Sequence, residues 1–403
     1  MNECSSNSTL FTQSREASTE FDCLLVAPSA HGLVRHCVAL LELLRSHSIN
    51  GALVSGPEAA EVLSDISTSI PFIASREHSI DWARSGGEGS GHVQQICRRN
   101  NLERIVRQEI SLCERHKPRF LITKNFFSVP ISAHSCRIPF VTYHTGGALH
   151  FDLTRNPLAR AEYSELTAEV NYVEDIFGVK RSDRFPSSLL SPWLNLCRGT
   201  ALSSQTEVTA LNPSNVRFLG SLNCDQSIGS LPAAMPFDIY ATLGTMIRSS
   251  DPFITLHRLL AQLERESLMT TVNVSPEMLP STPKVQCLKY IPNSFAIPRS
   301  KLVIHHGGHG TMIEALAHGK PQLVIPQNTK SACQDLQGFN LQALGLGDVY
   351  FHKEESERSF ALKVENLLSE SSQKTARDFA SQFQRDTRKG QDESIAELKR
   401  LLE

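Results

Sequence analysis

A glycine-rich segment at residues 301–311 carries the clearest sign of chemistry in this sequence of 403 residues. It reads Lys-Leu-Val-Ile-His-His-Gly-Gly-His-Gly-Thr, so an apolar strand runs into a glycine-rich turn and then into a helix. Glycines let a backbone approach a ligand closely. The first turn of a helix offers unpaired N–H groups and the positive end of the helix dipole. The segment therefore predicts a phosphate site.

The segment fits neither of the two commonest nucleotide motifs. No Gly-Lys-Ser or Gly-Lys-Thr follows its glycines, and the G-x-G-x-x-G spacing is absent, so it is neither a P-loop nor a dinucleotide fingerprint. A glycine-rich turn alone is most often a plain tight connection, so the surrounding residues decide. Asn293 ends a Tyr-Ile-Pro-Asn run and stands thirteen positions before His306. Downstream follow Glu314, Gly319-x-Pro321, Pro326, Gln334 and Gly345-x-Gly347.

This arrangement resembles the donor-binding signature of family 1 glycosyltransferases, which use UDP- or dTDP-sugars. Within that family it is most similar to the microbial macrolide-type branch, whose His-His-Gly-Gly-x-Gly-Thr motif is matched with His309 at the variable position. The resemblance covers residues 21–403 in layout but is specific only over residues 285–347. It implies the α/β fold called GT-B, in which two Rossmann-like parallel-sheet domains face each other across a cleft.

The resemblance implies a donor site in the second domain. Tyr290 replaces the tryptophan that stacks on the base, Ile291 offers backbone hydrogen bonds, and Asn293 replaces a glutamine near the ribose. His306 matches the diphosphate-binding histidine, and Glu314 the ribose-binding glutamate. The backbone at the start of the helix faces phosphate, and the remaining expected donor residues are Gly244, Thr245, Gly308, His309, Gly310, Thr311 and Gln334. Thr311 and Glu314 also have the spacing of a helix capping box.

The first domain lacks a second phosphate motif, so we expect it to bind the acceptor. His31 stands where the family places its general base, after the first strand, although Ala30 replaces the usual glycine before it. An imidazole pKa of ~6.5 suits that role near neutral pH. His36, one turn into the helix, is the less favoured candidate for the general base. His144 and Thr145, at the end of another strand, are expected to contact the acceptor, with a plain surface loop as the alternative.

Two positions depart from the family pattern. Lys124, beside Thr123, stands where the family often has an aspartate that orients the basic histidine, and Asp152 is a replacement only by position. A lysine near His31 would lower the pKa of that histidine. Cys333 and Gln334 stand where the family has the Asp-Gln pair that grips the sugar, and Asp335 is the alternative carboxylate.

These residues imply inverting displacement at the anomeric carbon, through an oxocarbenium-like transition state. His306 and the helix N-terminus would stabilise the leaving diphosphate, so we expect no metal and no cofactor beyond the UDP- or dTDP-sugar co-substrate. The acceptor is expected to be a small apolar molecule with a hydroxyl group. The alternatives are another GT-B enzyme acting on a lipid-linked or sugar acceptor, and a degenerate homologue that binds nucleotide-sugar as a non-catalytic partner.

Apolar runs that alternate with amphipathic stretches indicate two parallel-sheet domains. Strands are predicted at Cys23–Ala27, Ala52–Val54, Arg119–Thr123, Phe140–Tyr143, Asp238–Leu243, Thr270–Val274, Val285–Leu288, Leu302–His305 and Gln322–Ile325. Helices are predicted at Leu33–His47, Leu102–Glu114, Phe253–Glu266 and Thr311–Ala317; residues 157–200 show helical and irregular patterns without a strand signal. The expected layout is a disordered lead (1–20), an acceptor domain (21–220), a linker (221–236), a donor domain (237–390) and a helix crossing back (391–403).

Composition excludes other classes of protein. The formal net charge is -2 and no basic stripe is visible, so a nucleic-acid partner is not expected. The ten cysteines include no C-x-x-C pair, which argues against a zinc site. No apolar run reaches the ~18 residues of a membrane span, and no secretory signal pattern opens the chain. We therefore expect a cytoplasmic protein, as a monomer or homodimer.

Overall fold

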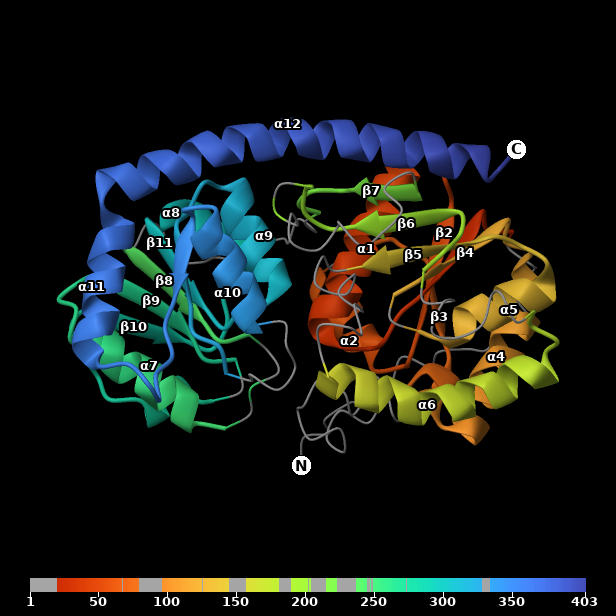
Figure 1. Cartoon of the computed structure of the whole chain (residues 1–403), viewed down its shortest axis with the longest axis horizontal. Coiled ribbons are helices and arrows are strands. Elements are labelled where there is room, and N and C mark those ends of the chain that lie inside the picture. Colours follow the sequence, from red (N-terminus) through yellow and green to blue (C-terminus); the bar gives the residue numbers. More distant parts are fainter. Residues whose placement is uncertain are drawn as a thin grey trace, which may run out of the picture.

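In the computed structural model of the protein, the described residues form thirteen parallel strands in two sheets (Figure 1). For residue 31 and residues 157–165 only the backbone is described. The described residues are 20–66, 68–79, 96–124, 126–144, 157–180, 190–201, 203, 215–222, 237–244, 247, 249–272, 274–327 and 334–403. The predicted lead thus lies outside the description except for Glu20, and the predicted linker except for two residues.

The first sheet has the order β3-β2-β1-β4-β5-β6-β7. Its order reverses between β1 and β4, which pair in parallel with Val26 opposite Thr123. Most of its strands are short apolar runs buried on both faces, as parallel strands between helices must be. Their bounds are β1 Cys23–Val26, β2 Gly51–Ser55, β3 Phe72–Ala74, β4 Phe120–Thr123, β5 Phe140–His144, β6 Leu194–Cys197 and β7 Val216–Phe218.

Helices cover both faces of this sheet. The side chains of Leu25, Leu53 and Ile122 pack with α1 and α2 on one face, while those of Leu24 and Leu121 pack with α4 and α5 on the other. The helices are α1 His31–Ser46, α2 Ala59–Ile66, α4 Arg99–His116, α5 Ser128–Cys136 and α6 Pro157–Ile176, with a 3-10 turn η1 at Arg76–His78.

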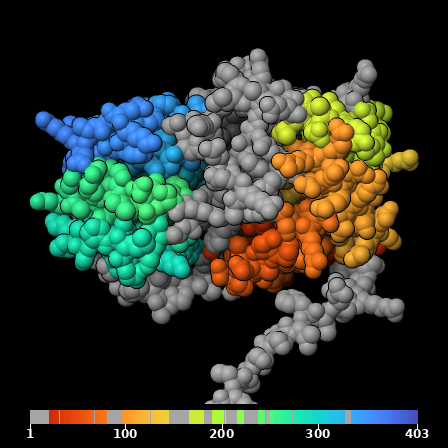
Figure 2. Space-filling view, turned by 90° about the horizontal axis from the view of Figure 1, so that it is seen from below, coloured from red at the N-terminus to blue at the C-terminus, as the bar shows by residue number. Residues whose placement is uncertain are grey.

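The second sheet has the order β10-β9-β8-β11-β12-β13 and reverses between β8 and β11. Its strands are β8 Ile239–Thr242, β9 Ser267–Thr270, β10 Val285–Leu288, β11 Leu302–His305, β12 Gln322–Val324 and β13 Gly347–Val349. Its helices are α7 Asp251–Ala261, α8 Asn293–Arg299, α9 His309–Ala317, α10 Gln334–Ala343 and α11 Glu357–Leu368, with a 3-10 turn η8 at Pro276–Met278. Figure 2 shows the segments of the two sheets on opposite sides of the molecule.

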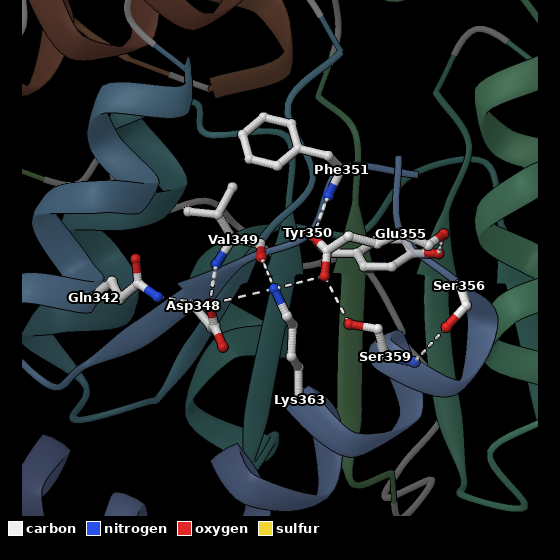
Figure 3. Close-up of polar contacts among 9 residues, drawn as sticks. All are labelled: Gln342, Asp348, Val349, Tyr350, Phe351, Glu355, Ser356, Ser359 and Lys363. Carbon is white, nitrogen blue, oxygen red and sulfur yellow. Dashed lines mark hydrogen bonds and ion pairs between the residues drawn. The ribbon is translucent and has the colours of Figure 1, made fainter. Parts of the chain in front are cut away.

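A polar network fixes the chain where it leaves β13 (Figure 3). The ammonium of Lys363 on α11 donates to the Val349 carbonyl and lies 2.9 Å from a Glu355 carboxylate oxygen. Glu355 also accepts the backbone N–H of Phe351 at 2.9 Å and the hydroxyl of Ser359 at 2.6 Å. Because one lysine and one glutamate tie the strand end to α11, this edge of the second sheet is held in place.

The last helix, α12 Glu370–Arg400, runs along both domains (Figure 1). Phe383 lies in the core beneath α9, whereas Ile395 and Leu398 lie in the core of the first sheet. A methyl group on Gly390 would collide with the Phe218 carbonyl of β7, so glycine allows the helix to lie directly on that strand. The crossing segment expected at 391–403 is thus the end of a helix that begins at Glu370.

Two predicted strand assignments are wrong. Residues 194–197 form β6 in a region predicted without a strand, because Asn195 interrupts the apolar run. Its amide is satisfied instead by the Thr142 hydroxyl, which donates to Asn195 Oδ1 at 2.6 Å. The strand expected at 270–274 lies at Ser267–Thr270, since the Thr271 hydroxyl closes a turn onto the Val274 carbonyl at 2.7 Å.

Candidate functional site

Each sheet reverses its order at one point, and the chemically interesting residues gather there. Open parallel sheets bind ligands outside the carboxyl ends of their strands at such switch points. In the second sheet, Gly244 follows β8 and His306 follows β11. In the first sheet, Lys124 follows β4 and donates its backbone N–H to the Val26 carbonyl of β1 at 2.8 Å. His31 begins α1 directly after the turn from β1.

His306 is held between two glycines. A Cβ placed on Gly244 would lie 2.5 Å from the imidazole Cε1, and one placed on Gly308 would lie 2.6 Å from the same atom. Gly244 also has a φ of +75°. Both the contact with His306 and this backbone conformation therefore favour glycine there. Burial lowers the pKa of His306 to about 4, and its Nδ1 has no hydrogen-bond partner among the described residues. A neutral imidazole thus lies beside the start of α9.

The neighbouring histidine is structural. Gly307 donates its backbone N–H to His305 Nδ1 at 3.1 Å, so Nδ1 accepts and Nε2 carries the proton. Nε2 then donates to the Gln322 side-chain oxygen at 2.9 Å. Burial lowers the pKa of His305 to about 3. These bonds anchor the turn that presents the next residue, His306.

Helix α9 begins at His309 with Gly308 as its N-cap, and no side chain caps it. Gly310 and Thr311 therefore lie in its first turn, where backbone N–H groups lack intrahelical partners. The capping-box interpretation of Thr311 and Glu314 is wrong, because the helix begins two residues before Thr311. The Thr311 hydroxyl instead accepts the Asn293 amide at 3.2 Å.

Tyr290, Asn293 and Glu314 lie together beside α9. The Tyr240 hydroxyl donates to Asn293 Oδ1 at 2.8 Å, which orients the amide, and the Tyr290 ring is 41% exposed. Ile291 is buried in the core beside them. Glu314 is 8% exposed, and its burial raises its pKa to about 7 against the opposing effects of Arg198, Asn293 and Arg35.

Gln334 lies at the start of α10, apart from this group. Its side-chain oxygen accepts the Gln327 backbone N–H at 2.8 Å, and its backbone lies against Gly307, so it supports the glycine-rich turn. Asp335 Oδ1 accepts the Leu336 N–H. Thr145, Thr245, Asp152, Cys333 and the His31 side chain lie outside the described residues.

Two buried cationic or imidazole side chains stand at the switch point of the first sheet. Lys124 is 0% exposed, and its ammonium lies 4.5 Å from the centroid of the Tyr143 ring without a hydrogen-bond partner among the described residues. Burial lowers its pKa to about 7. His144 is also buried with neither ring nitrogen paired in that part of the chain, and burial followed by the charge of Lys124 lowers its pKa to about 3.

Replacing Lys124 with methionine is expected to stabilise the protein by on the order of 1–3 kcal/mol at pH 6. The folded pKa of about 7 lies below the unfolded value of ~10.4, so the unfolded chain binds more protons between these values. Wild-type stability therefore rises with pH in that window, and the gain should shrink towards pH 10. Urea unfolding at pH 6 and 10 measures this difference.

Lys320→Met is the matched control, because the Lys320 ammonium donates to the carbonyls of Pro298 and Ser300 at 2.9 and 2.6 Å. That variant should be less stable than the wild type. A Lys124→Met protein that loses stability at pH 6 as well would show that the buried ammonium has partners of its own.

Residues that the sequence did not single out complete the site from the first domain. The Arg35 guanidinium lies 5.5 Å from the Tyr290 ring centroid, and Arg198 Nη1 lies 2.5 Å from His36 Nε2. A Cβ placed on Gly310 would lie 3.0 Å from His36 Nε2 and 3.5 Å from Arg198 Nη1. The first domain thus meets the second at the start of α9. The local feature that could have indicated Arg198 is its place directly after β6, but that strand was not predicted from the sequence.

The described residues also bear on a metal site and on a membrane span. No group of three or more histidine, cysteine, aspartate or glutamate side chains in that part of the chain is arranged to hold a metal ion. Among the same residues, no helix combines the length and the apolar character needed to cross a bilayer.

Residues 242–392 match the C-terminal domain of glycosyltransferase family 28. The aclacinomycin-T 2-deoxy-L-fucose transferase of Streptomyces galilaeus is 37% identical over 67 residues, which are 17% of this chain and 15% of that enzyme. The elloramycin glycosyltransferase of Streptomyces olivaceus is 48% identical over 44 residues, 11% of this chain and 12% of that enzyme. The chain thus spans 15% or less of the length of these curated relatives.

Among solved structures, the kitacinnamycin glycotransferase has a TM-score of 0.72 at 15% identity and covers 96% of this chain and 100% of its own. A structural likeness at 15% identity establishes the fold alone. The predicted GT-B fold is confirmed. The resemblance to microbial glycosyltransferases is confirmed as well, although the matching family carries the number 28 and not 1.

Proposed function

We propose that this chain, whose residues 242–392 match a glycosyltransferase domain, transfers a sugar from a UDP- or dTDP-sugar to a hydroxyl group of a small apolar acceptor. One observation carries the proposal: His306 is clamped between Gly244 and Gly308 at the N-terminus of α9. A neutral imidazole beside the first-turn N–H groups of a helix suits a diphosphate, which needs hydrogen-bond donors on several oxygens. The glycosyltransferase VinC, whose structure was solved with dTDP, has the same fold at a TM-score of 0.63 and 15% identity, covering 94% of this chain and 98% of its own.

The remaining donor contacts follow from the side chains grouped beside α9. In this proposal, the Tyr290 ring stacks on the base because one face of an exposed aromatic ring can cover it. Asn293, oriented by Tyr240, and Glu314 bind the ribose hydroxyls. An ionised carboxylate accepts hydroxyl hydrogen bonds more strongly than a protonated carboxyl group does. Because the pKa of Glu314 is about 7, its contribution to the affinity should grow as the pH rises through 7.

The proposed reaction is a single displacement with inversion. The acceptor oxygen forms a bond to the anomeric carbon while the bond from that carbon to the diphosphate oxygen breaks. His31 takes the acceptor's hydroxyl proton, and the electron pair leaves with the diphosphate. The N–H groups of α9 and His306 stabilise the negative charge that develops there, so no metal ion is needed for charge compensation.

Nucleotide binding without added metal tests the proposal. Calorimetric titration of UDP, dTDP and GDP should show that UDP or dTDP binds, and that His306→Ala lowers its affinity by about 10- to 100-fold through the loss of the one hydrogen bond that the neutral imidazole donates to a charged oxygen. His318→Ala is the matched control, since His318 is exposed at the other end of α9, and it should bind as the wild type does. If no nucleotide binds the wild type, the donor site is not functional and the proposed function is wrong.

A further inference from the structure

Arg198 is a buried cation that forms no salt bridge with a carboxylate of the described residues. It is 1% exposed and follows β6, where its backbone N–H donates to the His144 carbonyl at 3.1 Å. Nη2 donates to the Leu222 carbonyl at 3.4 Å, and Nε has no hydrogen-bond partner among the described residues. A buried guanidinium normally has a carboxylate or phosphate opposite it.

The group that Arg198 meets is an imidazole and not an acid. Nη1 donates to His36 Nε2 at 2.5 Å, so the proton of His36 is on Nδ1. Burial is the larger cause, and the charge of Arg198 the second, that holds the pKa of His36 well below its usual range. His36 is therefore neutral and does not compensate the positive charge of Arg198. This bond also occupies the Nε2 lone pair, which disfavours His36 as the substitute base.

The charge of Arg198 points at a second positive feature. Nη1 lies 3.5 Å from a Cβ placed on Gly310, in the first turn of α9, where the helix dipole places about half a positive charge. Lys124 and Arg35 add further positive charge around His36. Glu314 is an acid that interacts electrostatically with Arg198: the charge of Arg198 lowers the pKa of Glu314, but burial has the larger effect and raises it to about 7. Two positive groups that face each other in a water-poor site need an anion between them.

We propose that Arg198 binds the diphosphate of the donor from the first domain, opposite the N–H groups of α9. The inference rests on the proposed donor site and adds a ligand to it that the donor-domain motif does not contain. A guanidinium offers a planar pair of N–H donors that matches phosphate oxygens. The diphosphate is thus bound by both domains, and the donor itself holds the first domain against α9.

Arg198→Gln tests the proposal by comparing ligands with and without the charged group. Calorimetry should show that the affinity of the bound nucleoside diphosphate, UDP or dTDP, falls by about 10- to 100-fold, whereas uridine or thymidine binds as to the wild type. Arg198→Lys should recover part of the loss because it keeps the charge but not the fork. Arg217→Gln is the control, since Arg217 lies in β7 of the same domain and pairs with Glu397 at 2.8 Å.

The outcomes separate the two proposals. If Arg198→Gln binds the diphosphate as tightly as the wild type does, the role of Arg198 is overturned while the donor site stands. If the wild type binds no nucleoside diphosphate, the proposed function fails first.

A second measurement uses the wild type alone, in case Arg198→Gln does not fold. Hydrogen exchange should show that the nucleoside diphosphate protects both α9 and the backbone at residues 196–200, whereas the nucleoside protects only the second domain. Protection confined to the second domain with both ligands would overturn the role of Arg198 without any variant.

Discussion

His31→Ala is expected to lower the rate of sugar transfer by about 10²- to 10⁴-fold, the usual contribution of a general base, and to leave nucleotide affinity unchanged. The reason lies in the backbone: His31 begins α1 at the switch point of the first sheet, whereas the proposed nucleotide contacts come from the second domain and from Arg198. Initial rates of nucleotide release at saturating donor, together with calorimetry of the nucleotide, measure the two quantities separately.

His36→Ala gives the matched comparison, because it removes another imidazole from the same helix. Since His36 Nε2 is engaged by Arg198, this variant should weaken nucleotide binding more than it slows transfer at saturating donor. A His31→Ala enzyme with the wild-type rate would place the base elsewhere. If His36→Ala then showed the large loss of rate, His36 would be the base despite its contact with Arg198.

Gly307→Ala is expected to destabilise the protein by about 2–5 kcal/mol and to abolish measurable nucleotide binding. Gly307 has a φ of +90°, which costs an alanine roughly 1–2 kcal/mol. A Cβ there would also lie 2.5 Å from the Gln334 carbonyl oxygen and 2.8 Å from its Cα. These are backbone atoms that cannot rotate away, so the start of α10 or the turn beside His306 must shift, which adds the cost of overpacking, roughly 1–3 kcal/mol.

Gly345→Ala separates the two costs. Gly345 also has a positive φ, +69°, but no atom lies within 4 Å of a Cβ placed there. That variant should lose about 1 kcal/mol in urea unfolding and bind nucleotide normally. Equal losses in the two variants would show that the contact between Gly307 and Gln334 does not hold the turn.

The donor side of the site could be predicted from the sequence because its residues are close in the chain. His306, Gly308 and Glu314 lie on one strand-turn-helix unit, whose local pattern fixes both the fold and the motif. The exact start of the helix was not predictable in this way: α9 begins at His309, so a spacing typical of a capping box falls inside the helix.

The first-domain half of the site could not be predicted in the same way. Arg198 reaches Gly310 across more than a hundred residues of sequence, and no local pattern encodes that proximity. Its strand, β6, was concealed because Asn195 is polar, and that residue is buried only because Thr142 satisfies its amide. Tertiary contacts thus decide both whether β6 forms and where the side chain of the following residue, Arg198, lies.

The long helix α12 also determines how the two domains can move. It is part of the core beneath α9 through Phe383 and part of the first domain's core through Leu398, and at Gly390 it lies directly on β7. A motion that preserves these contacts is a rotation of one domain relative to the other about α12. Moving the domains apart along α12 would break the contacts. In the proposed reaction, the angle of that rotation would set how bulky an acceptor can enter between His31 and α9, so a helix far from the chemistry would limit the size of the acceptor.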